Sequence, residues 1–162
     1  MATRIKRTFA IYRQEGKEGV IVNKDPGEEA SQTWIKGAPL TEDSSSKELK
    51  IWAGTTNADK IVGIAAKDAT GTTGADVPYI EATDYNLFAA TLVDATSDHV
   101  LAAGDINTAY SLIADGDNWY VDKNDTTTKK VIVIAPIDDI GDTNARVVVR
   151  FATDFQQKVG AA

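Results

Sequence analysis

Short runs of β-branched and aromatic residues, separated by turn residues at intervals of about 8–12 positions, restrict most strongly how this chain folds. The clearest runs are Lys130–Ala135 (KVIVIA) and Arg146–Ala152 (RVVVRFA), with the loop Pro136–Asn144 between them. Roughly ten such runs are present, and no amphipathic segment of about ten residues or more accompanies them. The pattern predicts an all-β fold, a single compact β-barrel or β-sandwich domain.

Length and composition exclude several classes of protein. A chain of 162 residues has the size of one domain and buries a core without covalent cross-links. The absence of cysteine excludes disulfides, a thiolate nucleophile and cysteine-based metal sites. No run approaches the roughly 18 apolar residues of a membrane span, and the N-terminus lacks the apolar centre of a signal peptide. We therefore expect no cleaved signal and no membrane partner.

Charge is unevenly distributed along the chain, whose formal net charge is −7. Residues 1–24 hold six basic and two acidic side chains, so the body carries the excess of acid. The sequence therefore predicts a basic, extended N-terminal arm, residues 1–18, on a β-rich body, residues 19–162. A basic arm favours a charged partner. Nucleic acid is disfavoured because the acidic body would repel phosphates.

The arm contains the first β-forming runs. Thr8–Arg13 and Gly19–Asn23 flank the glycine-bearing segment Gln14–Glu18, which predicts a hairpin or two successive strands. In a regularly extended arm, alternation separates two sets of side chains: Arg4 and Lys6 on one side, and Ile5, Arg7 and Phe9 on the other.

The central stretch Lys60–Leu92 is typical of a strand, a tip, a second strand, a turn and a third strand. The tip, Asp68–Asp76, has two glycines, three threonines and no large apolar residue, which predicts a loop of low packing density that projects from the body. It is not a phosphate-binding loop, because it lacks the Gly-Lys-Ser/Thr sequence and leads through Asp76 and Pro78 into a strand.

Two acidic segments raise the question of calcium, which binds 6–8 oxygens. Neither segment has the glycine and terminal glutamate of an EF-hand, and Asx turns account for such residues in exposed loops. We therefore expect no metal site. The segments contain Asp115, Asp117, Asp122, Asn124 and Asp125, and then Asp138, Asp139 and Asp142.

His99 is the only histidine of the chain. A catalytic triad needs a nucleophile and an orienting carboxylate around it. Ser97 and Asp98 adjoin it in sequence, but neighbours on a strand point to opposite faces. We expect a solvated or hydrogen-bonded turn histidine, no catalytic residue, no cofactor and no enzymatic activity. A hydrolase would need carboxylates that converge in a cleft.

Aromatic residues are core residues in most β proteins, because they bury the largest apolar area. Two groups nevertheless suit a surface role. Trp119 and Tyr120, beside Asp115–Asn118, would form the aromatic platform of a carbohydrate- or receptor-binding module. Trp34, next to Lys36 between two loops, is a candidate interface anchor.

Several segments carry a family resemblance. Ala38-Pro-Leu40 is followed by Lys60-Ile-Val-Gly-Ile-Ala-Ala-Lys-Asp-Ala69, by the tip, and by Val77-Pro-Tyr-Ile-Glu-Ala82. The last strand, Asn144-Ala-Arg-Val-Val-Val-Arg-Phe151, precedes a short polar tail. In these features the chain, over roughly Gly37–Phe155, resembles the capsid decoration (cement) proteins of tailed bacteriophages.

The resemblance implies a structural virion protein, made in the host cytoplasm and located on the outer capsid surface. Its partner would be the major capsid protein, and it would act, commonly as a homotrimer, by clamping neighbouring capsomers. We expect the arm to become ordered by adding a strand to a neighbouring subunit, because an isolated arm has few local partners. The residues expected at the capsid or subunit interface are Arg4, Ile5, Lys6, Arg7, Phe9, Tyr12, Arg13 and Trp34. The alternative is a carbohydrate- or receptor-binding β-module on a virion surface.

Overall fold

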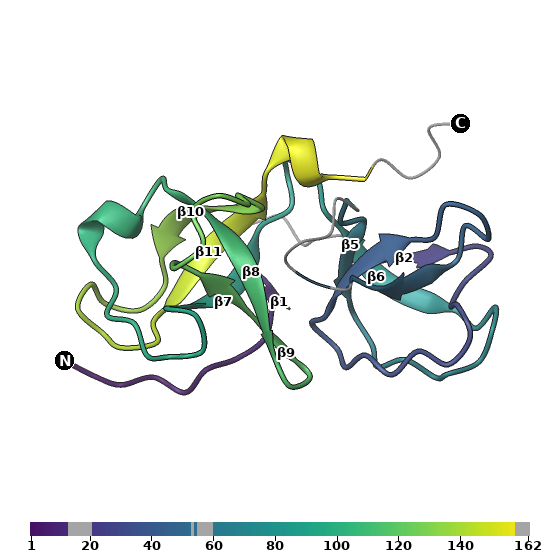
Figure 1. The fold of residues 1–162 in the computed structure, drawn as a ribbon, viewed down its shortest axis with the longest axis horizontal. Coiled ribbons are helices and arrows are strands. Elements are labelled where there is room, and N and C mark those ends of the chain that lie inside the picture. Colours follow the sequence, from purple (N-terminus) through teal and green to yellow (C-terminus); the bar gives the residue numbers. More distant parts are fainter. Residues whose placement is uncertain (13–20, 53, 55–59, 158–162) are drawn as a thin grey trace.

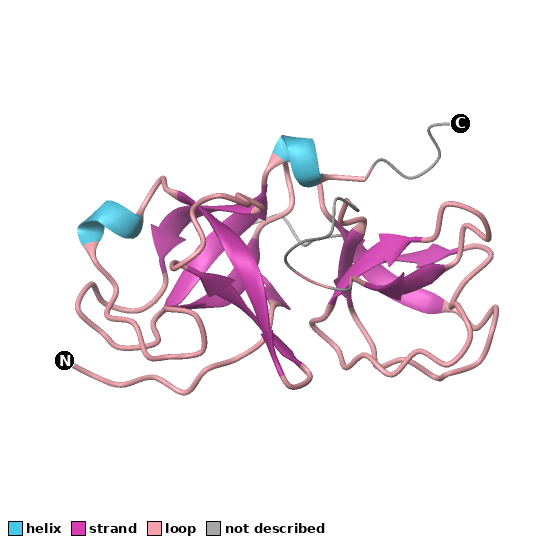
Figure 2. Cartoon of the chain, in the orientation of Figure 1, coloured by secondary structure: helices cyan, strands magenta, loops and turns pink. Residues whose placement is uncertain are grey.

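The computed structural model describes residues 1–12, 21–52, 54 and 60–157. Within these ranges the regular structure consists of eleven strands and two single-turn 3-10 helices, η1 (Ala103–Asp105) and η2 (Thr153–Phe155), as Figure 2 shows. The all-β prediction is confirmed. Neither of these helices is long and apolar enough to cross a membrane.

Five strands close into a small barrel. Their order is β7-β11-β10-β8-β9, and a parallel pair between β9 and β7 completes the circle. The short strand β1 (Ala10–Ile11) pairs with β7 from outside this circle. The barrel strands are β7 (Phe88–Val93), β8 (Ala109–Asp115), β9 (Asn118–Asp122), β10 (Val131–Pro136) and β11 (Arg146–Phe151).

A second, separate sheet holds five further strands in the order β2-β6-β5-β3-β4. Figure 1 shows the sheet beside the barrel, so the molecule has a barrel lobe and a sheet lobe. The sequence pattern predicts a barrel or a sandwich, and the structure combines a closed barrel with a separate sheet. Its strands are β2 (Ile21–Lys24), β3 (Pro39–Glu42), β4 (Leu49–Ile51), β5 (Gly63–Ala65) and β6 (Val77–Glu81).

The two lobes share one hydrophobic core, which supports a single compact domain. Trp52, which directly follows β4, packs against Trp119 of β9 with 5.3 Å between ring centroids. The fully buried Lys130 places its Nζ 5.0 Å from the Trp52 ring centroid and 4.2 Å from that of Phe155. Burial lowers the pKa of Lys130. This contact between the lobes is called the interlobe seam below.

The first two strands do not form a hairpin, because β1 belongs to the barrel and β2 to the other sheet. The structure instead has two successive strands that do not pair with each other, which was the alternative expectation. The connecting turn Gln14–Glu18 and the boundary between residues 18 and 19 lie outside the described residues. By contrast, β8 and β9 form a hairpin at Asp115-Gly-Asp-Asn118, a turn sequence that favours a hairpin, with Gly116 at a φ of 61°.

The tip Asp68–Asp76 is exposed or half-buried throughout, as predicted for a loop. It is nevertheless tied to the body by Glu28, which is 1% exposed. The Glu28 carboxylate accepts hydrogen bonds from the N–H groups of Thr70 and Gly71 and from the Thr70 hydroxyl. The Glu28 main chain also bonds to Gly74 and Ala75. The tip is therefore a fastened loop rather than a free projection.

Candidate functional site

The N-terminal arm lies along the outside of the barrel, where its first residues bind the loop before β11. Thr143 donates its N–H to the carbonyl oxygen of Ala2 and accepts the N–H of Arg4, both at 2.8 Å. Asp142 accepts the N–H of Ala2 at 2.8 Å and the guanidinium Nε of Arg4 at 2.9 Å. Main-chain and side-chain bonds thus fix the start of the arm at the same loop.

The middle of the arm is held by β7 and by the turn that follows it. Thr91, fully buried in β7, accepts the N–H of Arg7 at 2.9 Å and donates its hydroxyl to the Arg7 carbonyl at 3.0 Å. The Nζ of Lys6 donates to the carbonyl of Thr96 at 2.7 Å. It also lies 3.6 Å from the Asp98 carboxylate.

The last part of the arm enters the core and then pairs with β7. Phe9 is 3% exposed, and its ring stacks on that of Phe151 with centroids 5.8 Å apart. Ala10 and Ile11 then pair with β7, and the N–H of Tyr12 reaches the carbonyl of Leu87. The arm is therefore bound to its own chain, and the expectation that it has few local partners is wrong.

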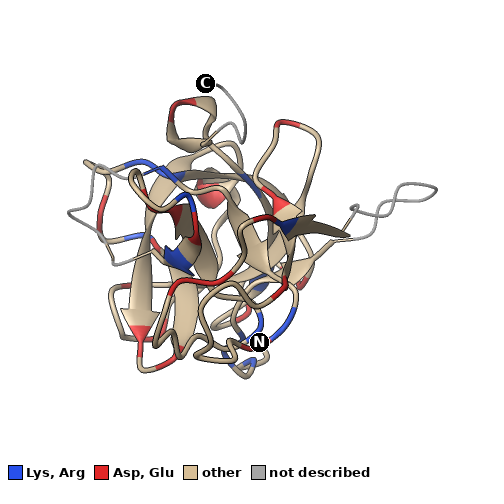
Figure 3. Cartoon of the chain, turned by 90° about the vertical axis from the view of Figure 1, so that its right-hand side faces the viewer, with Lys and Arg blue, Asp and Glu red and all other residues tan. Residues whose placement is uncertain are grey.

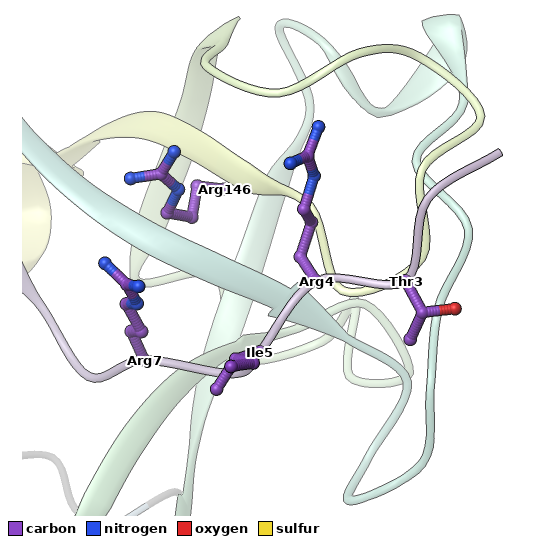
Figure 4. Close-up of a pocket in the computed structure, with 5 residues that line it drawn as sticks. All are labelled: Thr3, Arg4, Ile5, Arg7 and Arg146. Atoms are coloured by element: carbon purple, nitrogen blue, oxygen red, sulfur yellow. The ribbon is translucent and has the colours of Figure 1, made fainter.

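A groove runs between the arm and β11. Its volume is about 280 Å³, and Figure 4 shows the guanidinium groups of Arg4, Arg7 and Arg146 on the same side of the arm. Regular alternation would place Arg4 and Arg7 on opposite sides, but residues 4–9 form no strand. The residues that line this arm groove are Thr3, Arg4, Ile5, Arg7 and Arg146.

Two of the three arginines in the arm groove are neutralised by carboxylates. Arg4 pairs with Asp142 at 2.8 Å, and Arg146 pairs with Asp138 at 2.9 Å. The N–H of Ala2 and the Arg4 side chain lower the pKa of Asp142, and the Arg146 side chain lowers the pKa of Asp138. Arg7 has no ion pair within the described part of the chain. Its charge is therefore available to an acidic partner.

The charge division expected from the sequence is less sharp in space. Figure 3 shows basic and acidic residues on neighbouring segments rather than on two separate faces. The arm charges account for this, because Arg4 and Lys6 face Asp142 and Asp98 of the body. Among the exposed residues of the arm, Arg7 is a charged residue without an ion pair in the described ranges, and Ile5 is a large apolar residue that is 79% exposed.

Of the other expected interface residues, two lie in the core. Phe9 and Trp34 are each 3% exposed, so neither presents a surface to a partner in this conformation. The indole Nε1 of Trp34 donates to the carbonyl of Lys67 at 3.1 Å, which satisfies its one polar atom inside the sheet lobe. Tyr12 is half-buried, and Arg13 lies outside the described residues. The interface assignment of Trp34 is therefore corrected to a core position.

The aromatic platform expected at Trp119 and Tyr120 is absent. These two side chains are 4% and 5% exposed, and Trp119 belongs to the interlobe seam. Adjacent residues of a strand normally face opposite sides, but β9 is covered on both sides. The carbohydrate-binding alternative therefore loses the residues that were expected to carry it.

His99 is a buried, hydrogen-bonded residue. Its Nε2 lies 2.9 Å from Oδ2 of Asp105, whose Oδ1 accepts the hydroxyl of Tyr110 at 2.8 Å. Burial opposes ionisation of Asp105, but the bonds from His99, Ala102 and Tyr110 outweigh it and lower the pKa of this carboxyl. Burial and Asp105 raise the pKa of Tyr110 to about 12. No hydroxyl or thiol bonds to the His99 ring in the described ranges, so the cluster lacks a nucleophile.

The carboxylates of the first acidic segment accept hydrogen bonds from main-chain N–H groups. Asp122 accepts the N–H groups of Ala95 and Asn124, and Asp125 accepts those of Thr127 and Thr128. The bonds from Asn124, Thr127 and Thr128 are the Asx-type contacts expected of turn residues, whereas Ala95 lies 27 positions from Asp122. Across residues 1–12, 21–52, 54 and 60–157, no group of three or more histidine, aspartate or glutamate side chains is placed to hold a metal ion.

Comparison with known proteins adds no assignment. No protein-family model matches the chain, and neither the curated proteins nor the solved structures contain a significant match. The resemblance to capsid decoration proteins thus rests on the sequence segments themselves.

Proposed function

We propose that this protein is a structural virion protein that binds the outer surface of a bacteriophage capsid shell and stabilises it by bridging neighbouring capsomers. The observation that carries the proposal is the arm groove: a docked arm presents the exposed Ile5 beside the uncompensated Arg7. An apolar anchor next to a charge is the usual composition of a protein–protein contact. The resemblance supplies the class of partner, the major capsid protein.

The way in which the arm is held supports a rigid contact surface rather than a disordered tether. Its backbone is bonded to Thr143, Thr91 and Leu87, so little conformational entropy is lost when a partner binds. A partner surface with an acidic residue opposite Arg7 and an apolar depression opposite Ile5 would complement it. The arm then contacts the shell from its docked position, and no strand exchange is required.

A purely structural role is part of the proposal. Within the described ranges, the titratable cluster around His99 is buried. The Asp105 carboxylate of this cluster forms three hydrogen bonds, with His99, Ala102 and Tyr110. The carboxylates beside the arm groove are held in ion pairs with Arg4 and Arg146. These arrangements stabilise the fold, and they occupy the carboxylates of the His99 cluster and those beside the arm groove.

The test is binding of purified protein to undecorated shells of the virus that encodes it. Deleting the arm is unsuitable because it would also remove Phe9 from the core. We therefore specify Ile5→Ala and Arg7→Glu, both on the exposed part of the arm. Lys36→Glu is the matched control, since it makes the same charge change at an exposed residue of the sheet lobe.

Loss of shell occupancy in both arm variants, with the control unchanged, would support the proposal. Arg7→Glu should also weaken the salt dependence of binding, because that charge acts through long-range attraction. Equal occupancy for all variants would refute the arm groove as the contact. The homotrimer that the resemblance implies is tested separately, by sedimentation of the free protein and by imaging decorated shells, where isolated and non-touching copies would exclude it.

A further inference from the structure

A second surface pocket lies where the chain passes between the lobes. Its volume is about 360 Å³, within the ~300–1,000 Å³ range of small-molecule sites. One wall is the turn between β6 and β7, and the other is the segment that follows η2. Figure 1 shows these two segments together above the junction of the lobes. The lining residues are Glu81, Ala82, Thr83, Asp84, Tyr85, Gln156 and Gln157.

The turn in this pocket is held in place by Asp84. Its Oδ1 accepts hydrogen bonds from Arg150 at 3.0 Å, Thr153 at 2.9 Å and Gln156 at 2.9 Å. The bonds from Gln156 and Thr153 lower the pKa of Asp84, so this carboxylate is ionised at neutral pH. The contacts involve Oδ1, which leaves Oδ2 as an acceptor at a fixed position. The binding surface is therefore preformed.

Gln157 supplies a donor with a defined orientation. Its Oε1 accepts the N–H of Glu42 at 3.0 Å and the hydroxyl of Thr41 at 3.3 Å. Because the oxygen is directed into the sheet lobe, the amide Nε2 is left to donate elsewhere. The Glu81 carboxylate adds a further acceptor in the lining and has no side-chain bond within the described ranges. Acceptors and donors thus surround one pocket.

Tyr85 provides an aromatic surface at the same pocket. It is 91% exposed, whereas the aromatic side chains of the core, such as Trp119, are almost fully buried. The turn beneath it is fixed by bonds from the N–H groups of Tyr85 and Asn86 to the Thr83 hydroxyl. A fixed backbone holds a large, exposed ring beside fixed acceptors and a donor.

We propose that this pocket binds a neutral saccharide through Tyr85, Asp84 and Gln157. The C–H face of a pyranose ring carries partial positive charge and packs on the electron-rich face of an aromatic ring. The sugar hydroxyls donate to Asp84 and Glu81 and accept from Gln157. An anionic sugar is disfavoured, because Glu81 and Asp84 contribute two carboxylates and Arg150 compensates only one of them. The site differs from the arm groove and does not depend on the proposed capsid contact.

The test uses the full chain and a panel of D-glucose, D-galactose, D-mannose and N-acetyl-D-glucosamine, with sialic acid as the anionic probe. Binding is followed by changes in the backbone amide NMR signals. We expect at least one neutral sugar to shift signals of residues 81–86 and 156–157, and sialic acid to leave them unchanged. Tyr85→Ala should weaken binding by about tenfold or more, whereas Tyr85→Phe, which keeps the ring, should bind like the parent.

Arg7→Glu separates this proposal from the capsid contact, since it should lose shell binding and keep the sugar response. The saccharide site is refuted if no sugar of the panel shifts these signals, or if Tyr85→Ala binds sugar as well as the parent. Loss of shell binding in Tyr85→Ala, without a sugar response in the parent, would instead assign the pocket to a protein contact and overturn the proposal. Equal binding of sialic acid would refute the selectivity.

Discussion

The hydroxyl of Thr91 binds both polar groups of the Arg7 backbone: it accepts the Arg7 N–H at 2.9 Å and donates to the Arg7 carbonyl at 3.0 Å. A single buried side chain of β7 thereby replaces the two ladder bonds that a strand would make at this point of the arm. The arm keeps its hydrogen bonds without adopting strand geometry. As a result the Arg7 side chain can turn toward the groove that Arg4 also lines.

Replacing Thr91 by valine should loosen the arm. The substitution preserves the shape of the side chain but leaves the N–H and C=O of Arg7 without partners, at a cost of about 1–3 kcal/mol to the docked arm. Cleavage by trypsin after Arg4, Lys6 or Arg7 should therefore accelerate, because a protease needs a detached segment. Thr3→Val is the matched control, since Thr3 is exposed and lies in the same arm. Equal cleavage rates for both variants would contradict the role of Thr91.

Acid should release the start of the arm through Asp142. Because its bonds to Ala2 and Arg4 lower the pKa of Asp142 below the ordinary 3.8, the carboxylate stabilises the docked arm at pH values above 3.8. This contribution is lost as the pH falls from 3.8 through the lower pKa of the folded state. The NMR signals of Ala2 and Thr143 should shift in that acidic range and stay constant between pH 5 and 7. In Asp142→Asn the acid-dependent shift should vanish; its persistence would mean that another group controls the arm.

The strand pattern and the hairpin at Asp115–Asn118 were predictable because they are local. Alternating β-forming runs and a turn sequence with glycine act on neighbouring residues. The division of the strands into a barrel and a second sheet was not predictable, because it depends on pairings between distant residues such as Leu92 with Val121. Closure of the barrel also required a parallel pair, for which a sequence dominated by hairpin signals gives no indication.

The arm groove, too, could be predicted only in part from the sequence. The basic character of the arm could be predicted from composition, whereas the exposure of Ile5 could not, because isoleucine is among the residue types most often buried. The partners of the arm could not be predicted, because Asp142 lies 138 positions from Arg4 and its neighbours in sequence indicate only a turn. Trp34 and Trp119 were misplaced for a related reason. A tryptophan near polar loop residues has the same sequence signature whether it packs inward or outward, and only the shared core between the lobes buries it.

The interlobe seam should make the protein unfold in one step. Since Trp52 and Trp119 join the cores of the two lobes, loss of either lobe exposes apolar surface of the other. Trp119→Ala should cost about 3–5 kcal/mol and separate the thermal transition into two. Calorimetry provides the measurement, with Tyr85→Ala as the control that truncates an exposed aromatic residue. Two transitions already present in the parent protein would show that the lobes unfold independently.

The buried Glu28 should be the residue on which the tip 68–76 depends most. Its carboxylate is an acceptor for the N–H groups of Thr70 and Gly71, and it has no donor of its own. Glu28→Gln places an amide NH2 among these donors, so at least one of them loses its partner at a cost of about 1–3 kcal/mol. The melting temperature should fall by about 2–4 °C for each kcal/mol lost. Hydrogen exchange at Thr70 and Gly71 should accelerate, because their amides open with the tip.

Asp76→Asn makes the same chemical change at an exposed position of the tip, and it should leave both the melting temperature and the exchange rates unchanged. The comparison separates the loss of an acceptor at Glu28 from a general effect of removing negative charge from an acidic protein. If Glu28→Gln melts like the parent while Thr70 and Gly71 remain protected, the backbone bonds of Glu28 to Gly74 and Ala75 suffice to hold the tip. In that case the tip would be fixed by main-chain pairing, and its glycines, rather than the buried carboxylate, would determine its shape.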